Sequence, residues 1–154
     1  HCDHPARALA LQAFHDRWQD SPLVMEKWFM MESMSLVSGT VARLGELMAH
    51  PAFDANTPNK LRSVLGAFMT GNPVHFYAED GSGFDFIGDC LIDIDARNPQ
   101  LAARMALPLT RRTQYAPARR AKMGAVLQEL QQQAQSNDLR EVIDKALADG
   151  PSPV

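Results

Sequence analysis

The stretch TPNKLRSVLGAFMTGNP, residues 57–73, decides the fold class of this chain. Its apolar residues recur every three or four positions, which is the spacing of one face of an α-helix. Thr57-Pro58 is typical of a helix start, with an N-cap followed by proline in the first turn. Gly71-Asn72-Pro73 ends the helix. The stretch therefore predicts an amphipathic helix with a buried stripe, and the residues of that stripe are Leu61, Val64, Leu65, Phe68 and Met69.

Helical periodicity continues on both sides of this stretch, and no segment shows a convincing strand-like alternation. Apolar alternation at Val74, Phe76 and Ala78 is too short to predict a strand. We therefore predict an all-α fold, an α-solenoid-like superhelical stack of about eight antiparallel helices, with residues 1–154 as a single domain. The other predicted stripes are Leu11, Phe14 and Trp18; Val24, Trp28, Met31 and Met34; Val41, Leu44 and Met48; Phe84, Ile87, Leu91 and Ile94; Leu101 and Met105; Met123, Val126, Leu127 and Leu130; and Leu139, Val142, Ile143 and Leu147.

The segment YAEDGSGFDF, residues 77–86, looks at first like a phosphate or calcium loop. A phosphate loop needs a Gly-Lys pair, and an EF-hand needs a glutamate at its twelfth position; neither is present. The segment is better explained as a helix entry, in which Asp80-Gly81 turns the chain, Ser82 accepts a bond from a first-turn amide and Asp85 faces the positive helix end. Farther on, Asn98-Pro99 starts a short helix that Pro108 is expected to end or kink.

Length and composition are those of a globular domain. The chain has 154 residues, of which 45% are hydrophobic and 21% charged. No stretch approaches the roughly 18 apolar residues of a membrane span, and Cys2 and Cys90 are too few for a disulfide framework. We expect a cytoplasmic protein without membrane association. The chain begins HCDHPAR without an initiator Met, so we interpret it as part of a longer protein whose preceding part covers an apolar flank of the first helix.

Charge is unevenly distributed. The net charge is −3, but residues 96–128 carry seven Lys/Arg and no Asp or Glu, which leaves −10 on the rest. This basic band suggests one possible function, a free-standing helical scaffold that binds an acidic protein partner. Nucleic-acid binding through the band is disfavoured, because few aromatic side chains accompany it for base stacking. The residues of the basic band are Arg97, Arg104, Arg111, Arg112, Arg119, Arg120 and Lys122.

No catalytic or metal-binding set is visible in the sequence. The five histidines never take the H-E-x-x-H spacing of a zinc hydrolase. The cluster His1-Cys2-Asp3-His4 is interpreted as incidental, and His15 as a solvated or partly packed side chain. We therefore predict no catalytic residue and no metal ligand in this chain.

Two polar placements are more informative. Gln100 and Arg104 are four residues apart, so they share a helix face opposite Leu101 and Met105. Arg62 lies off the apolar stripe of its own helix. An arginine on an exposed helix face is usually only solubilising, although its planar fork also suits recognition of carboxylates and carbonyls.

Four separated blocks of the sequence resemble a known family. LVMEKWFMMES (23–33), HPAFDANTPNKLRSVLGAF (50–68), FYAEDGSGFDF (76–86) and ARNPQLAARMALPL (96–109) are similar to the C-terminal domain of bacterial aminopeptidase N, an alanyl aminopeptidase of the zinc metallopeptidases. The resemblance extends from about residue 6 to 147. The departures are small: TPNK at 57–60 stands where the family usually has Asn-Pro-Asn-Arg, and Phe84 where it often has Tyr.

This resemblance implies a function for the whole enzyme and a place for this domain. The enzyme is expected to release N-terminal residues from peptides with a zinc ion that upstream domains bind. This domain is then a helical cap that covers the active-site cavity, contacts the upstream catalytic domain of the same chain and is inactive alone. The family positions that face the cavity match Arg62, Gln100 and Arg104, which are expected to bind the peptide beyond its first residue. The enzyme is expected to be a monomer.

Overall fold

The computed structural model describes residues 4–149, and every regular element in that range is a helix. This confirms the all-α class. The chain divides into two compact units between His75 and Phe76. The assignment of residues 1–154 to a single cap domain stays a prediction. None of the helices in the described range combines the length and apolar character that crossing a bilayer requires.

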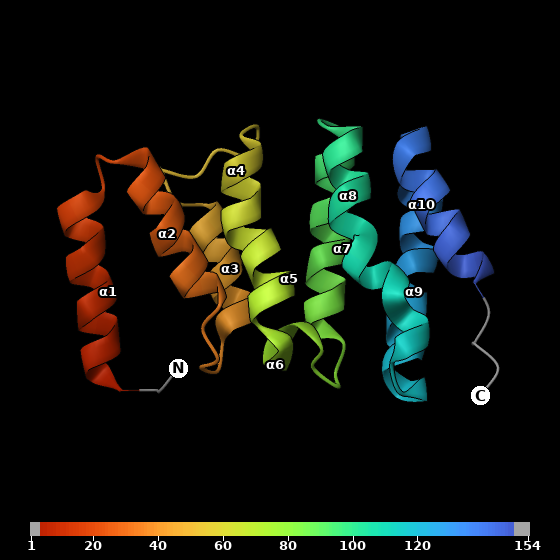
Figure 1. The fold of residues 1–154 in the computed structure, drawn as a ribbon, viewed down its shortest axis with the longest axis horizontal. Coiled ribbons are helices and arrows are strands. Elements are labelled where there is room, and N and C mark those ends of the chain that lie inside the picture. Colours follow the sequence, from red (N-terminus) through yellow and green to blue (C-terminus); the bar gives the residue numbers. More distant parts are fainter. Residues whose placement is uncertain (1–3, 150–154) are drawn as a thin grey trace. The chain divides into compact units, whose positions relative to one another are not determined.

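The first unit is organised around its second helix. In Figure 1, consecutive helices of this unit alternate in direction. The second helix, α2, contacts α1, α3 and a helical rod made of α4, η1 and α5. That rod runs without a break through a π-helical turn, and a short helix follows it. The elements are α1 (Pro5–Trp18), α2 (Pro22–Ser33), α3 (Thr40–Met48), α4 (Pro58–Leu61), the π-turn η1 (Arg62–Gly66), α5 (Ala67–Gly71) and α6 (Pro73–Phe76).

The apolar stripe from Leu61 to Met69 forms the core of this unit. All five of its apolar side chains are buried in the rod formed by α4, η1 and α5, and Val64 and Phe68 have no exposed surface. From α2, Met25 and Phe29 are equally buried. Burial of each such side chain stabilises the fold by about 1.5–3 kcal/mol, so the predicted stripe holds α2 and the rod together.

Asn72 ends the rod and ties it to the end of α2. Its side chain has no exposed surface, and its Nδ2 donates to the carbonyl oxygens of Ser33 at 3.1 Å and Ser35 at 2.6 Å. Its Oδ1 accepts from the backbone N–H of His75 at 3.2 Å. One buried amide therefore forms hydrogen bonds with three backbone groups at or near helix ends.

The second unit contains four longer helices. Consecutive helices again alternate in direction, with α7 and α10 each contacting both α8 and α9 (Figure 1). The predicted stripes of these helices supply most of the core: Phe84 and Leu127, for example, have no exposed surface. The elements are α7 (Ser82–Asp95), α8 (Pro99–Thr110), the 3₁₀ turn η2 (Arg111–Gln114), α9 (Pro117–Gln133) and α10 (Asn137–Ala148).

A buried carboxylate joins the end of α7 to the turn between α9 and α10. Asp95 is 2% exposed, and its Oδ2 accepts from the N–H groups of Gln135 at 2.8 Å and Ser136 at 3.0 Å. Its Oδ1 accepts from the hydroxyl of Ser136. The same hydroxyl oxygen caps α10 by accepting from the N–H of Leu139 at 3.1 Å. Asp95 thus positions both the turn and the cap that starts α10.

Two expectations for local structure need correction. Ser82 does not accept from a first-turn amide; its own N–H and hydroxyl donate to Asp80 Oδ1 at 2.9 and 2.7 Å. These two donors lower the pKa of the Asp80 carboxyl. Gly81 is the N-cap, with φ of +87°, a backbone conformation that favours glycine. The turn at Asp80-Gly81 is therefore as predicted, but the capping group differs.

Pro108 does not end α8. The helix continues through it to Thr110, and η2 follows directly. A proline inside a helix removes one backbone donor and crowds the carbonyl four residues earlier. Here the turn that contains it carries Leu109, which is completely buried. Burial of that side chain favours continuing the helix despite the proline.

The N-terminal edge of the first unit keeps an open apolar flank, as expected. Trp18 and Met31, which the sequence stripes placed in the core, are 39% and 50% exposed. A groove of about 550 Å³ lies between α1 and α2 and is lined mainly by apolar side chains. Its lining residues are Arg7, Ala10, Leu11, Phe14, Met31 and Met34.

Candidate functional site

The start of α8 is set by the asparagine and proline that the sequence singled out. The Oδ1 of Asn98 accepts from the N–H of Leu101 at 3.1 Å, and Pro99 occupies the first turn. This arrangement caps the helix and fixes its rotation, because Leu101 and Met105 are buried against neighbouring helices at 5% and 6% exposure. The polar residues that directly precede them, Gln100 and Arg104, are therefore held on the outer side.

Gln100 and Arg104 lie on that outer side, as predicted. Both side chains are exposed and stand one turn apart on α8. Neither forms a hydrogen bond or ion pair with any other residue of the range 4–149. An amide and a guanidinium together offer seven N–H donors and one acceptor oxygen. This face of α8 is therefore able to bind carbonyl and carboxylate groups of a ligand.

Arg62 belongs to the first unit and is described within it. Its exposed side chain begins the π-turn η1, where the backbone N–H of Ala67 donates to the Arg62 carbonyl. Its Nη1 donates to Asn59 Oδ1 at 3.1 Å. Gly66 lies beside it, since a Cβ at that position would be 3.6 Å from the Cβ of Arg62. The small neighbour leaves the guanidinium accessible.

The structure thus brings Gln100 and Arg104 together on one face. Arg62 lies on the other unit, and its membership of a common site with them stays a prediction. The π-turn was not predicted, because its apolar spacing matches that of an ordinary helix. Such turns are rare and are often found at functional positions.

Most of the basic band is used inside the second unit. Arg112 donates to the carbonyl oxygens of Ala146, Leu147 and Asp149 at the end of α10, at 3.1–3.2 Å. Four more of the seven cations bind backbone carbonyls in the same way. They are Arg97 on Asp93, Arg119 on Tyr77, Arg120 on Thr113 and Tyr115, and Lys122 on Asp80.

These contacts show that most of the basic band has a structural role. Five of its seven cations hold helix ends and turns in place, a role that sequence could not reveal because their partners are mostly distant in the chain. Only Arg104 and Arg111 form no hydrogen bond or ion pair within the described residues. The two remaining side chains, rather than the whole band, are available to a ligand.

A buried lysine has a similar structural role in the first unit. Lys60, which stands where the family usually has arginine, is 7% exposed. Its Nζ donates to the carbonyl oxygen of Pro22 at 3.2 Å and lies 5.4 Å from the centre of the Phe29 ring. Cation–π attraction and the hydrogen bond both stabilise the buried charge. Lys60 therefore connects α4 to the start of α2 and is not presented to a ligand.

Potential nucleophiles and metal ligands do not assemble into a site in the described part of the chain. Burial raises the pKa of the Cys90 thiol to about 12, with Asp89 and Asp93 adding to the effect, so it remains protonated at neutral pH. Between residues 4 and 149, no group of three or more His, Cys, Asp or Glu side chains could hold a metal ion. Of the incidental cluster, residues 1–3 lie outside the described range, and His4 caps α1 by accepting from the N–H of Ala6.

Two histidines form a hydrogen-bonded relay in the first unit. His50 Nδ1 accepts from the N–H of Ala52 at 3.0 Å, so its ring proton is on Nε2. That proton is donated to His15 Nε2 at 3.0 Å, and His15 Nδ1 donates to Asp16 Oδ1 at 3.0 Å. The His15 ring also packs 5.0 Å from Trp28. His15 is therefore partly packed, as interpreted, and it links α1 to the loop after α3. A metal bound at the paired Nε2 atoms would displace the proton that this relay requires.

The relay predicts a pH-dependent stability. Burial lowers the pKa of His50, and interactions with His15, Arg43 and Lys60 lower it further. The unfolded chain therefore takes up this proton first, near the ordinary histidine pKa of about 6.5. The contribution of neutral His50 is complete above that pH and is lost as the pH falls below it. We expect the Tm, measured by differential scanning calorimetry, to fall between about pH 7.5 and 5.5.

A pair of asparagine variants isolates the relay. His50→Asn keeps an acceptor for the N–H of Ala52 but removes the titration, so its Tm is expected to fall less steeply with acidification. His4→Asn, which likewise replaces a capping Nδ1 by an amide oxygen, should keep the wild-type slope. Equal slopes in all three proteins would show that His50 is not responsible.

Comparison with known proteins agrees with the helical architecture. Residues 1–148 match the family described as "Domain of unknown function (DUF3458_C) ARM repeats". Aminopeptidase N of Escherichia coli (strain K12) is 41% identical over 94% of this chain, and aminopeptidase N of Haemophilus influenzae (strain ATCC 51907 / DSM 11121 / KW20 / Rd) is 38% identical over 92%. The matched regions are 17% and 16% of those relatives, so the chain spans a small part of their length.

A solved structure has the same fold. The crystal structure of Legionella pneumophila aminopeptidase A in complex with aspartic acid superposes with a TM-score of 0.87 and 31% sequence identity. The match covers 91% of this chain and 16% of that one.

Proposed function

Because this chain belongs to the family of C-terminal helical domains of bacterial aminopeptidase N, we propose that it is the helical cap of a zinc-dependent aminopeptidase. In this proposal the domain covers the active-site cavity, restricts entry to peptides and unfolded chain ends, and has no activity alone. The zinc ion and the catalytic residues belong to other domains of the same polypeptide. The enzyme is a cytoplasmic monomer that releases N-terminal residues, including alanine, from peptides.

The outer face of α8 carries the peptide-binding part of the proposal. Gln100 and Arg104 are exposed side by side, and their donors are not used by the described protein residues. A peptide in an extended conformation presents carbonyl oxygens on both sides of its backbone, and guanidinium and amide groups are suited to bind them. We assign Gln100 and Arg104, together with Arg62, to the peptide chain beyond its first residue.

The groove between α1 and α2 supports a contact with the catalytic domain. Its lining is mainly apolar and includes Met31, which is 50% exposed. Exposed apolar patches of this kind are typical of interfaces. The chain also spans only about a sixth of its relatives' length. The proposed occupant of the groove is therefore the upstream part of the same polypeptide.

Replacing Arg104 tests the peptide-binding role. In the full-length enzyme, Arg104→Ala should lower kcat/KM for tetrapeptides and longer substrates by about tenfold, equivalent to ~1.4 kcal/mol, because charge-assisted hydrogen bonds to the chain are lost. Steady-state hydrolysis of unblocked and C-terminally amidated peptides measures the effect, which should be the same for both.

The matched control is Arg97→Ala, which removes an exposed arginine of the same band that donates to Asp93 O. It should leave kcat/KM within about twofold of the wild-type value, since the Arg97 guanidinium is already bound to the carbonyl oxygen of Asp93. An Arg104→Ala enzyme with wild-type kcat/KM for peptides of every length would contradict the proposed role.

A further inference from the structure

The exposed residues of α8 and its end form one continuous line. Among residues 99–111, only four side chains are exposed, and they are separated by four, three and four positions. At 100° per residue this spacing keeps all four within about 60° of one another around the helix. The four residues, called the α8 strip from here on, are Gln100, Arg104, Leu107 and Arg111.

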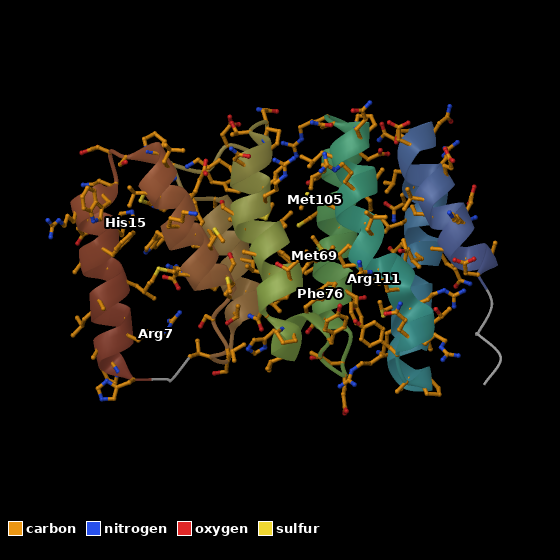
Figure 2. The ribbon with its side chains drawn as sticks, in the orientation of Figure 1. Arg7, His15, Met69, Phe76, Met105 and Arg111 are labelled. Carbon is orange, nitrogen blue, oxygen red and sulfur yellow. The ribbon has the colours of Figure 1, made fainter. Side chains whose placement is uncertain are left out.

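Arg111 is the second unused cation of the basic band. It lies at the end of α8, where η2 begins (Figure 2). Like Arg104, it has no hydrogen-bond or ion-pair partner within the described residues, whereas the adjacent Arg112 is bound to three carbonyls. Residues 96–128 contain no acidic side chain that could neutralise it through a local contact. Its charge is therefore available to an anionic group.

Two tyrosines accompany Arg111. The charge of Arg111 acts on Tyr77, whose ring stacks on Tyr115 at 4.7 Å between centres. Burial and a hydrogen bond with Tyr115 raise the pKa of Tyr77. Tyr77 therefore stays a neutral hydrogen-bond donor near Arg111.

The strip has the dimensions of a short peptide segment. Arg104 and Arg111 are seven residues apart, which at 1.5 Å per residue is about 10 Å along the helix. An extended peptide advances about 3.3 Å per residue, so the same distance corresponds to about three peptide residues. Leu107 lies between the two cations and is 49% exposed, which gives an intervening apolar side chain of the ligand a surface to contact.

We propose that Arg111 binds the free C-terminal carboxylate of short peptide substrates whose chain lies along the α8 strip. The inference rests on the proposed function, because it takes Gln100 and Arg104 as the groups that hold the preceding part of the chain. Arg111 then selects substrates by both length and terminal charge: a peptide ending about three residues past Arg104 reaches it with a carboxylate, and shorter or amidated peptides do not use it.

The test compares acids with amides in the full-length enzyme. The substrates are alanine-initiated peptides of two to eight residues, each with a free or amidated C-terminus. The acid-to-amide ratio is kcat/KM for the free acid divided by kcat/KM for the amide of the same length. In the wild-type enzyme this ratio should rise about five- to tenfold at one chain length. Arg111→Gln should bring this ratio back to the value for dipeptides, while kcat/KM for amidated peptides stays within about twofold of the wild-type value.

Arg97→Gln provides the control for loss of one positive charge from the band, and its acid-to-amide ratio should follow the wild-type profile. An unchanged ratio in Arg111→Gln would overturn the assignment of Arg111. Failure of the proposed function is distinguishable, because it appears as wild-type kcat/KM in Arg104→Ala for acids and amides alike. A wild-type enzyme whose acid-to-amide ratio does not vary with length would also overturn the inference.

Discussion

Asp95→Ala is expected to lower the free energy of unfolding of the second unit by about 3 kcal/mol, a large part of the stability of an ordinary domain. The substitution removes a carboxylate that is 2% exposed and accepts from Gln135 N–H, Ser136 N–H and the Ser136 hydroxyl. Two backbone donors then lose their acceptor inside the fold. Urea unfolding measures the loss, and hydrogen–deuterium exchange locates it at residues 134–140.

Two neighbouring substitutions separate the buried contacts from general effects of charge. Asp93→Ala removes an exposed carboxylate two residues earlier on α7 and should change stability by less than about 0.5 kcal/mol. Asp95→Asn keeps an oxygen for the backbone donors but loses the charge, and should cost less than Asp95→Ala. Equal stability of Asp95→Ala and Asp93→Ala would show that the turn between α9 and α10 does not depend on Asp95.

Asn72→Ala is expected to destabilise the first unit by about 2–3 kcal/mol. The wild-type amide donates to Ser33 O and Ser35 O and accepts from His75 N–H, and it has no contact with solvent. Alanine leaves Ser33 O and the His75 N–H without these partners and opens a small cavity, whereas Ser35 O keeps the bond from the Thr40 hydroxyl. Exchange of the His75 amide and of amides near the end of α2 should become faster, as followed by hydrogen–deuterium exchange.

The isosteric Asn72→Asp variant tests which side of the amide matters. It keeps an acceptor for His75 N–H but replaces the two donors by an oxygen that faces two carbonyl oxygens. Its stability at neutral pH should therefore be no higher than that of Asn72→Ala. An Asn72→Asp protein as stable as wild type would exclude the two bonds to Ser33 and Ser35 as the source of the stabilisation.

The elements predicted most reliably from sequence were those whose signals are local. The stripe from Leu61 to Met69 fixes its helix, and its burial is complete because five apolar side chains at helical spacing leave a single energetically favourable face. Asn98-Pro99 likewise marks the start of α8, since capping depends only on residues within one turn. Whether the helix ends at Pro108 could not be decided from sequence, because the cost of the proline is local, whereas the burial of Leu109 that offsets it is tertiary.

The candidate site also has some features that could be predicted from sequence and others that could not. The common face of Gln100 and Arg104 follows from their spacing, and the structure has it as predicted. The roles of Arg112 and Lys122 could not be predicted, since their carbonyl partners lie 34 and 42 positions away in the chain. The same holds for the relay of His15 and His50, which are 35 positions apart. Long-range contacts decide which polar residues remain available, and sequence spacing does not.

The arginines that hold backbone carbonyls have one consequence for how charged molecules approach the second unit. Carbonyl oxygens are neutral acceptors, so these bonds fix the guanidinium groups in space without cancelling their charge. Their combined potential extends over roughly a Debye length, about 8–10 Å at physiological salt, and attracts anions from solution. Immobile cations thus generate the far-reaching field, and Arg104 and Arg111 make the short-range contacts. Raising ionic strength should weaken capture of acidic peptides more than it loosens the helices that these arginines join.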